Sequence, residues 1–168
     1  MMIKHTNIVL WRHADAVDAK SPEETDITRE LSAKGRGQAK KMAVWLRHNL
    51  PKNTLVLTSP AVRAEQTAQA LKWDYRIIKS LQPITTLSEV VNALQKVEAN
   101  NVLLVGHQPW LGELAAYLLE LPNTKAPLNS ASIKKGAVWW FKQKKVAQGD
   151  AAQIRPYGLV SVQHPDFI

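Results

Sequence analysis

Cysteine is absent from all 168 residues of the chain. Without thiols the protein can form no disulfide framework, no thiolate metal site and no cysteine nucleophile. Any reactive side chain must therefore come from another residue type. The absence also fits a reducing compartment, so we expect a cytoplasmic protein.

Long apolar runs and glycine-rich nucleotide loops are missing as well. The first apolar run, 8–11, is far too short for a signal-peptide core or a membrane span, so no membrane partner is expected. No Walker-type loop is present, which argues against a nucleotide-cradling P-loop. No histidines or glutamates have the usual close spacing of zinc ligands, and we expect neither a metal nor another cofactor.

Length and composition predict one globular domain spanning residues 1–168, because 45% of the residues are apolar and no linker or repeat interrupts the chain. The net charge of +8, from 22 basic and 14 acidic residues, has two interpretations. It suits an anionic partner such as a phosphorylated molecule, and it equally suits a solvated basic surface. The lysine clusters lack interleaved aromatic residues, so nucleic acid is not an expected partner.

Short apolar runs alternate with amphipathic segments along most of the chain. This alternation predicts an α/β three-layer sandwich, in which helices cover both faces of a largely parallel central sheet. The expected parallel strands are 8–11, 55–58, 102–105 and an edge-like strand at 75–80, and strands 137–141 and 159–162 are expected to add an antiparallel edge. The expected helices run from the N-cap Ser32 to about Asn49, from the N-cap Ser59 with Pro60, from the N-cap Ser88, and from about Leu111 to Leu121.

Polar and charged residues directly follow three of the predicted strands. Arg12 and His13 follow the first, Ser59 and, one turn later, Arg63 follow the second, and His107 follows the clearest buried strand. Ligands of open α/β sheets bind beyond the carboxyl ends of the strands. A single histidine at such a place is more often structural, but together these residues form a cationic cup suited to phosphate, with Ser59 as an additional phosphate ligand.

The motifs that carry these residues resemble the histidine phosphatase superfamily, also called the phosphoglycerate mutase-like fold. Arg12-His13 resembles its Arg-His signature, residues 59–68 (SPAVRAEQTA) its second-arginine segment, and Val105-Gly106-His107 its second histidine. The similarity extends through about Leu121. The short chain and the RAEQT wording look most like the SixA-type phosphohistidine phosphatase branch.

The resemblance implies a metal-free phosphatase in which His13 attacks phosphorus and is transiently phosphorylated before water releases phosphate. It assigns Arg12, Arg63 and His107 to the phosphoryl oxygens, where preorganised donors stabilise the transition state. Asp15, two residues beyond the nucleophile, has two interpretations. It either orients His13 or donates a proton, or it merely caps the loop.

Two features depart from the family pattern. Ala14 stands where much of the superfamily has glycine, so that turn must use a backbone angle that a side chain tolerates. The acidic motif with which mutase and phosphomonoesterase relatives protonate an alcohol is also missing, since neither Glu65 nor Glu89 has a matching context. An imidazole leaves more readily than an alkoxide, so phosphohistidine on a protein is the preferred substrate.

Three alternatives stay open at this point. The first keeps the fold and makes the protein a small-molecule phosphomonoesterase with Asp15 or Glu65 as the acid. The second is a non-catalytic module that binds phosphate or a phosphoprotein in the same cup. A nucleic-acid binder is third and is supported by charge alone.

Overall fold

A computed structural model describes residues 3–21, 25–119, 131–144 and 157–168. The elements in chain order are β1 (Asn7–Arg12), η1 (Asp26–Thr28, a 3-10 turn), α1 (Ala33–Asn49), β2 (Leu55–Thr58), α2 (Val62–Gln69), β3 (Tyr75–Ile77), η2 (Lys79–Leu81, also 3-10), α3 (Leu87–Gln95), β4 (Asn101–Gly106), α4 (Trp110–Leu118), β5 (Val138–Gln143) and β6 (Tyr157–Gln163).

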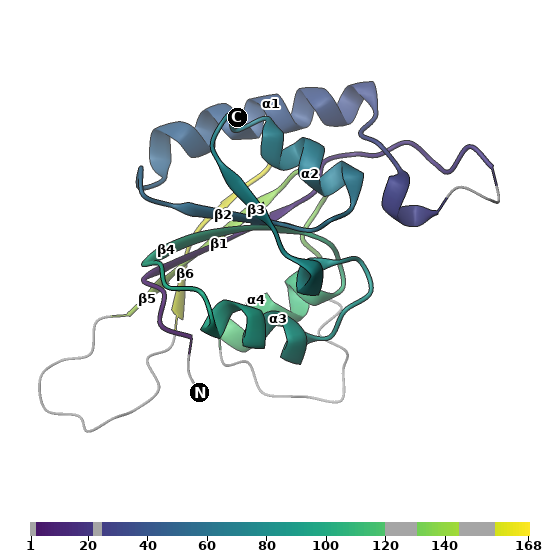
Figure 1. The fold of residues 1–168 in the computed structure, drawn as a ribbon. Coiled ribbons are helices and arrows are strands. Elements are labelled where there is room, and N and C mark those ends of the chain that lie inside the picture. The colour runs from purple at the N-terminus through teal and green to yellow at the C-terminus, as the bar shows by residue number, and fades with distance from the viewer. Residues whose placement is uncertain (1–2, 22–24, 120–130, 145–156) are drawn as a thin grey trace, which may run out of the picture.

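All six strands belong to one sheet with the order β3-β2-β4-β1-β5-β6. Strands β1 to β4 are parallel, while β5 pairs antiparallel with β1 and β6 antiparallel with β5. Helices α1 and α2 lie over one face of the sheet and α3 and α4 over the other (Figure 1). The predicted three-layer α/β sandwich with an antiparallel edge is therefore confirmed. Within the described ranges, no helix is both long and apolar enough to cross a membrane.

The two central strands, β1 and β4, are apolar at residues 8–11 and 102–105 because both of their faces are covered there. Ile8 and Leu10 of β1 belong to the core beneath α3 and α4. Val9 and Trp11 point the other way, into the core beneath α1 and α2. Polar side chains are excluded from such a strand until it leaves the core, so the first charged residues appear at its tip.

Helix α1 begins as predicted, with Ser32 as the N-cap and its Oγ accepting a hydrogen bond from the Gly35 amide at 3.0 Å. Gly35 lies against the loop after β1, since a Cβ atom there would be 1.9 Å from the carbonyl oxygen of Asp15. Gly37 has open space at the same position. The close approach of the loop backbone thus explains why residue 35 is a glycine, but it does not explain Gly37.

The predicted start of α2 is wrong by about two residues. The helix begins at Val62 with Ala61 as the N-cap, and no side chain caps it. Ser59 Oγ does accept a hydrogen bond from the Ala61 amide, at 3.1 Å, but this bond closes the turn before the helix. The serine hydroxyl also contacts His107, a tertiary contact that its local sequence does not indicate.

The predicted start of α3 is wrong as well, because Thr86 and not Ser88 is the N-cap. Thr86 Oγ1 accepts from the Glu89 amide at 3.3 Å, and Glu89 Oε2 accepts from the Thr86 amide at 3.0 Å. This reciprocal capping box gives an acceptor to each of two backbone amides at the start of the helix, those of Thr86 and Glu89. A helix that began with Ser88 as its N-cap would not have this pair of bonds.

Other boundaries differ by smaller amounts. The predicted edge strand 75–80 is at the sheet edge, but it ends at Ile77 and continues as the turn η2. Helix α4 begins at Trp110, and its predicted end at Leu121 lies outside the described residues. Strands β5 and β6 are each longer than predicted.

Candidate active site

The carboxyl ends of β1, β2 and β4 meet because their hydrogen bonding continues one residue beyond each strand. The His13 amide donates to the Gly106 carbonyl oxygen at 3.0 Å, and the Ser59 amide donates to the Val105 carbonyl oxygen at 3.0 Å. Strand β4 lies between the other two. His13 and Ser59 are thereby held on either side of the residue that follows β4, His107.

His13 is held with one ring nitrogen occupied and the other facing a cation. Its Nδ1 is 2.8 Å from the Ala14 carbonyl oxygen, which can only accept, so Nδ1 carries the proton. Arg63 Nε–H points at His13 Nε2 at 3.3 Å. Burial lowers the pKa of His13 to about 3, the bond to Ala14 opposes this shift, and the charges of Arg63 and Arg12 add to it. Nε2 therefore carries a free electron pair at neutral pH.

Arg63, in the first turn of α2, is only 4% exposed and uses each of its three nitrogens. Besides the contact with His13, Nη1 donates to the Asp26 carbonyl oxygen at 2.5 Å and Nη2 to Asp26 Oδ2 at 2.7 Å. A buried guanidinium requires such a counter-charge. These two bonds hold the turn η1 against Arg63.

Arg12 leaves β1 toward the segment that precedes β5. Its Nη1 donates to the Ile133 carbonyl oxygen at 2.8 Å. Burial lowers the pKa of Arg12, and the nearby charge of Arg63 lowers it further. The positive charges of the Arg12 and Arg63 guanidinium groups repel each other, and an anion bound between them would relieve that repulsion.

His107 packs beside the other site histidine, with the ring centroids of His13 and His107 5.0 Å apart. Its Nε2 is 2.8 Å from Ser59 Oγ, and both side chains are buried. Burial lowers the pKa of His107 to about 2, and the neighbouring His13 contributes to the shift. Both rings are therefore neutral at physiological pH.

Three buried side-chain atoms in the described part of the chain have no hydrogen-bond partner, namely Arg12 Nε, His107 Nδ1 and Trp110 Nε1. A buried polar atom without a partner is costly and is rare in folded proteins. Two of the three belong to residues at the strand tips beside His13. Arg12 Nε–H is a donor suited to an oxygen of a bound anion, and so is His107 Nδ1 when it carries the ring proton.

Asp15 is not in hydrogen-bond contact with His13. Its Oδ1 is 2.8 Å from Lys135 Nζ, and its Oδ2 accepts from Ser32 Oγ at 2.7 Å. The hydrogen bonds from Lys135 and Ser32 lower the pKa of Asp15. The carboxylate is thus ionised at neutral pH and links the loop after β1 to the start of α1. Asp15 therefore lies at the rim of the site. The structure brings the other five predicted site residues together at the strand tips, namely Arg12, His13, Ser59, Arg63 and His107.

Ala14 forms its turn without the backbone freedom of glycine. In the described ranges only Lys72, among non-glycine residues, has a positive φ. Ala14 is fully buried, and its amide donates to Thr67 Oγ1 of α2 at 3.1 Å. The turn is therefore held by a side chain of the second-arginine segment.

Asp26 and Lys135 are site residues that sequence reasoning missed. Asp26 binds Arg63 from 37 positions away, and Lys135, whose charge also lowers the pKa of His13, binds Asp15 from 120 positions away. Neither lies in a local motif. The one available signal is that a buried Arg63 needs an acidic partner, and Asp26 is one of only four acidic residues in the segment 17–29.

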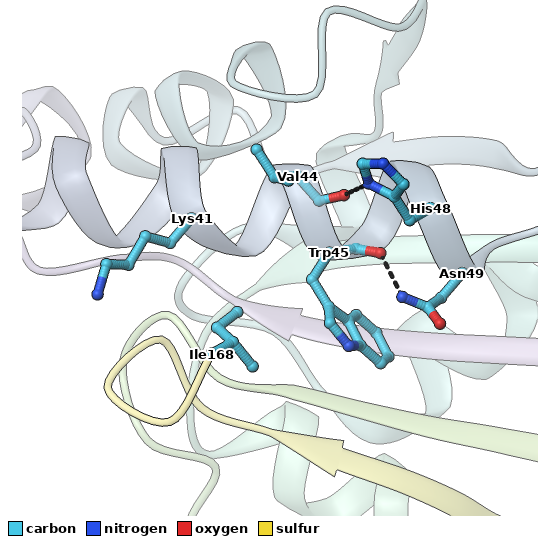
Figure 2. Close-up of a pocket in the computed structure, with 6 residues that line it drawn as sticks. All are labelled: Lys41, Val44, Trp45, His48, Asn49 and Ile168. Carbon is cyan, nitrogen blue, oxygen red and sulfur yellow. Dashed lines mark hydrogen bonds between the residues drawn. The ribbon is translucent and has the colours of Figure 1, made fainter.

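A second feature of the surface lies away from the strand tips. An open, mostly apolar groove of about 430 Å3 runs along α1 beside the last residue of the chain (Figure 2). None of the predicted site residues contributes to it. Its lining residues are Lys41, Val44, Trp45, His48, Asn49 and Ile168.

The strand-tip arrangement combines a neutral imidazole with fixed positive charge. His13 Nε2 offers an electron pair, Arg12 and Arg63 supply the positive charge, and Arg12 Nε and His107 Nδ1 are buried without partners. Within the described ranges, no three histidine or acidic side chains are grouped so that they could hold a metal ion. Transfer of a phosphoryl group to a histidine requires only such a nucleophile and such donors.

Comparison with known proteins agrees with this chemistry. The family model for the histidine phosphatase superfamily (branch 1) matches residues 8–90. The phosphohistidine phosphatase SixA of Escherichia coli (strain K12) is 30% identical over 135 residues, which cover 74% of this chain and 80% of that protein. A SixA homolog of Haemophilus influenzae is 29% identical over 128 residues, covering 67% and 76% of the two chains.

A solved structure extends the similarity to the tail of the chain. The protein histidine phosphatase SixA complexed with tungstate superposes with a TM-score of 0.71, at 24% identity, over 96% of this chain and 98% of that one. At this identity the match supports the fold, including the antiparallel edge beyond the family model. The chain is therefore a phosphatase of the histidine phosphatase superfamily, branch 1, and belongs to its SixA type.

Proposed function

We propose that this phosphatase hydrolyses phosphohistidine on a protein partner, with His13 as the nucleophile. The observation that carries the proposal is the state of the His13 ring. Its Nδ1 proton is committed to the Ala14 carbonyl, and its lowered pKa leaves Nε2 unprotonated. An unprotonated imidazole nitrogen is a competent nucleophile toward phosphorus.

The reaction has two balanced steps. In the first, the Nε2 electron pair forms a bond to phosphorus while the bond from phosphorus to the substrate imidazole breaks. The departing nitrogen keeps that electron pair and takes a proton from solvent. In the second, the oxygen of a water molecule forms a bond to phosphorus while the phosphorus–nitrogen bond breaks, its electron pair returns to Nε2, the water gives up a proton to solvent, and phosphate leaves. Arg12, Arg63 and His107 stabilise the charge on the phosphoryl oxygens in both steps.

The carboxylates around the cup favour a substrate whose leaving group needs little help. Hydrogen bonds from Lys135 and Ser32 lower the pKa of Asp15. Partial burial raises the pKa of Asp26, but the hydrogen bonds and the charges of Arg63 and Arg29 together lower this pKa by more. Both groups are ionised at neutral pH and are poor proton donors. An alkoxide needs a positioned acid, whereas the imidazole of phosphohistidine does not.

A comparison of substrates tests the proposal. We expect kcat/KM for a protein phosphorylated on histidine to exceed that for an alkyl phosphomonoester by about 100-fold or more, the usual contribution of a general acid. Equal values would overturn the substrate assignment and support a small-molecule phosphomonoesterase. Binding of the phosphoprotein without release of phosphate would instead support the non-catalytic module.

The variant Asp15→Asn tests, in the same assay, whether Asp15 acts as a general acid. The substitution keeps the shape of the side chain and removes its ability to donate a carboxylic proton. Since the ionised Asp15 donates no proton, we expect little change with either substrate. A loss of about 100-fold with the alkyl ester alone would identify Asp15 as a general acid and contradict this part of the proposal.

A further inference from the structure

We propose that Ser59 is a positioning residue that fixes which nitrogen of His107 carries the ring proton. Its hydroxyl donates to Nε2, so that the proton stays on Nδ1 and Nδ1–H is directed to the phosphoryl group. This inference rests on the proposed function for its consequence in catalysis. The hydrogen-bond arrangement itself can be tested without any substrate.

The position of Ser59 leaves its hydroxyl few options. The residue is fully buried, and its amide is bound to the Val105 carbonyl oxygen, which ties the tip of β2 to β4. Its Oγ accepts a hydrogen bond from the Ala61 amide at 3.1 Å and lies 2.8 Å from His107 Nε2. These two contacts occupy the hydroxyl, so we infer that Ser59 acts through His107 and does not bind phosphate directly.

A count of buried polar groups selects the direction of the bond to His107. If Nε2–H donated to Ser59, the hydroxyl oxygen would accept twice and its own hydrogen would be buried without a partner. His107 Nδ1, which has no protein partner, would then be a bare electron pair. If the hydroxyl donates to Nε2, only the Nδ1–H donor is left over. Because each orphaned buried group costs about 1–3 kcal/mol, the second arrangement is favoured.

The choice matters because the His107 ring is neutral and has a single N–H. With the proton on Nδ1, the one free polar atom of the ring is a donor, as is the unpartnered Nε of Arg12. With the proton on Nε2, the ring would present an electron pair to a negatively charged oxygen. A preorganised donor would thus be replaced by a repulsive contact in the transition state.

The first test is a long-range proton–nitrogen NMR spectrum of the full chain labelled with 15N-histidine. The spectrum of His107→Asn identifies the His107 signals by their loss. We expect Nδ1 of His107 to show the shift of a protonated nitrogen and Nε2 that of an unprotonated one at pH 7.5. Addition of inorganic phosphate should move the Nδ1 signal. A spectrum with the proton on Nε2 would overturn the inference.

Variants then connect the proton position to turnover. Ser59→Ala should move the His107 proton to Nε2 and reduce kcat by about 100- to 1000-fold, the range for loss of one such donor. Ser59→Thr keeps the hydroxyl and should retain the wild-type protonation pattern. Thr58→Val is the matched control, because it removes the neighbouring buried hydroxyl, which contacts the Ser59 carbonyl and not His107. That variant should leave both the spectrum and kcat unchanged.

The outcomes separate this inference from the proposed function. The inference about Ser59 would be contradicted if Ser59→Ala lowered kcat and left the His107 spectrum unchanged. It would also be contradicted if the ring proton moved to Nε2 and kcat stayed the same. A wild-type protein that hydrolyses no phosphohistidine would overturn the proposed function, while the wild-type spectrum would still decide the hydrogen-bond arrangement. If Ser59→Ala does not fold, the wild-type spectrum decides alone.

Discussion

At the scale of single residues, the site depends on two histidines that are kept neutral. His13 and His107 are 7% and 2% exposed, and burial is the main cause of their lowered pKa values. Protonation of His13 would remove its electron pair, and protonation of His107 would add charge beside two arginines. Burial therefore keeps the electron pair of His13 Nε2 available across the physiological range.

The first prediction concerns the titration of these rings. We expect neither His13 nor His107 to titrate between pH 8 and about pH 5, because their pKa values are lowered to about 3 and about 2. NMR signals of the ring protons, followed against pH, measure this directly. After unfolding in urea the same rings should titrate near the ordinary value of about 6.5. A folded-state midpoint near 6.5 for His13 would contradict the account.

The second prediction compares two arginines that share Asp26. Arg63 contacts both Asp26 and His13, whereas Arg29 binds Asp26 Oδ1 at 2.9 Å and does not contact His13. Arg63→Ala should reduce kcat by about 100- to 1000-fold, as for the loss of a preorganised charge donor. Arg29→Ala should leave kcat within a few-fold. Equal losses in the two variants would mean that Asp26, and not Arg63, is the important group.

At the scale of elements, tertiary contacts decide where helices begin and which glycines are required. Ser59 has the local sequence of an N-cap, but its hydroxyl is used by His107. Ser88 has the same potential, but Thr86 forms the box with Glu89 one residue before α3. The chain therefore assigns similar serines and threonines to different tasks according to what lies beside them.

The third prediction uses the two glycines of α1 as a matched pair. Gly35→Ala places a methyl group 1.9 Å from the Asp15 carbonyl oxygen, where no atom fits. The loop behind the nucleophile must shift, and we expect a loss of unfolding free energy of several kcal/mol together with lower kcat. Gly37→Ala meets nothing within 4 Å and should stabilise the protein by about 0.5–1 kcal/mol. Urea denaturation measures the unfolding free energy of both variants. Equal changes in the two would contradict the close contact between Gly35 and the Asp15 carbonyl oxygen.

The fourth prediction concerns the cap of α3. Thr86→Ala removes the side chain that binds the Glu89 amide, and should cost about 1 kcal/mol of unfolding free energy. Ser88→Ala, inside the helix, should be close to neutral. The same denaturation experiment distinguishes the two variants. A larger loss of unfolding free energy for Ser88→Ala would support Ser88 as the N-cap and contradict the capping box.

At the scale of the whole molecule, the fold and the five strand-tip residues could be predicted because both follow from apolar runs. A strand buried on both faces ends where polarity begins, and parallel strands end at one edge, so Arg12, His13 and His107 are brought together by topology. Ser59 and Arg63 follow β2 in the same way. The resemblance of these motifs to a known family then added the chemistry.

Contacts that close over long stretches of chain could not be predicted in this way. Asp26 and Lys135 reach the site from segments without periodic patterns. The two interpretations of Asp15 could not be separated from the sequence for the same reason, since its partners Lys135 and Ser32 come from different parts of the chain. A carboxylate near a nucleophile in sequence is a candidate acid only until its partners are known.

The fifth prediction links the buried histidines to the acid stability of the molecule. Between about pH 3 and 6.5 the unfolded chain binds more protons at His13 and His107 than the folded protein does. Their contribution to stability is therefore complete above pH 6.5 and is lost as the pH falls, by up to about 1.4 kcal/mol per pH unit for each ring. Urea denaturation at several pH values should show this slope, and His107→Asn should reduce it. An unchanged slope in that variant would contradict the assignment.

The most direct test of the central claim, that His13 is the nucleophile, is to trap the phosphorylated enzyme. The protein is mixed with a partner carrying labelled phosphohistidine and quenched in base within milliseconds. We expect label on the wild-type chain and on His48→Ala, whose exposed histidine lies outside the site, and this label should be stable in base and lost in acid. His13→Ala should carry no label and release no phosphate. Label of the same kind on His13→Ala, or release of phosphate by that variant at the wild-type rate, would contradict the claim.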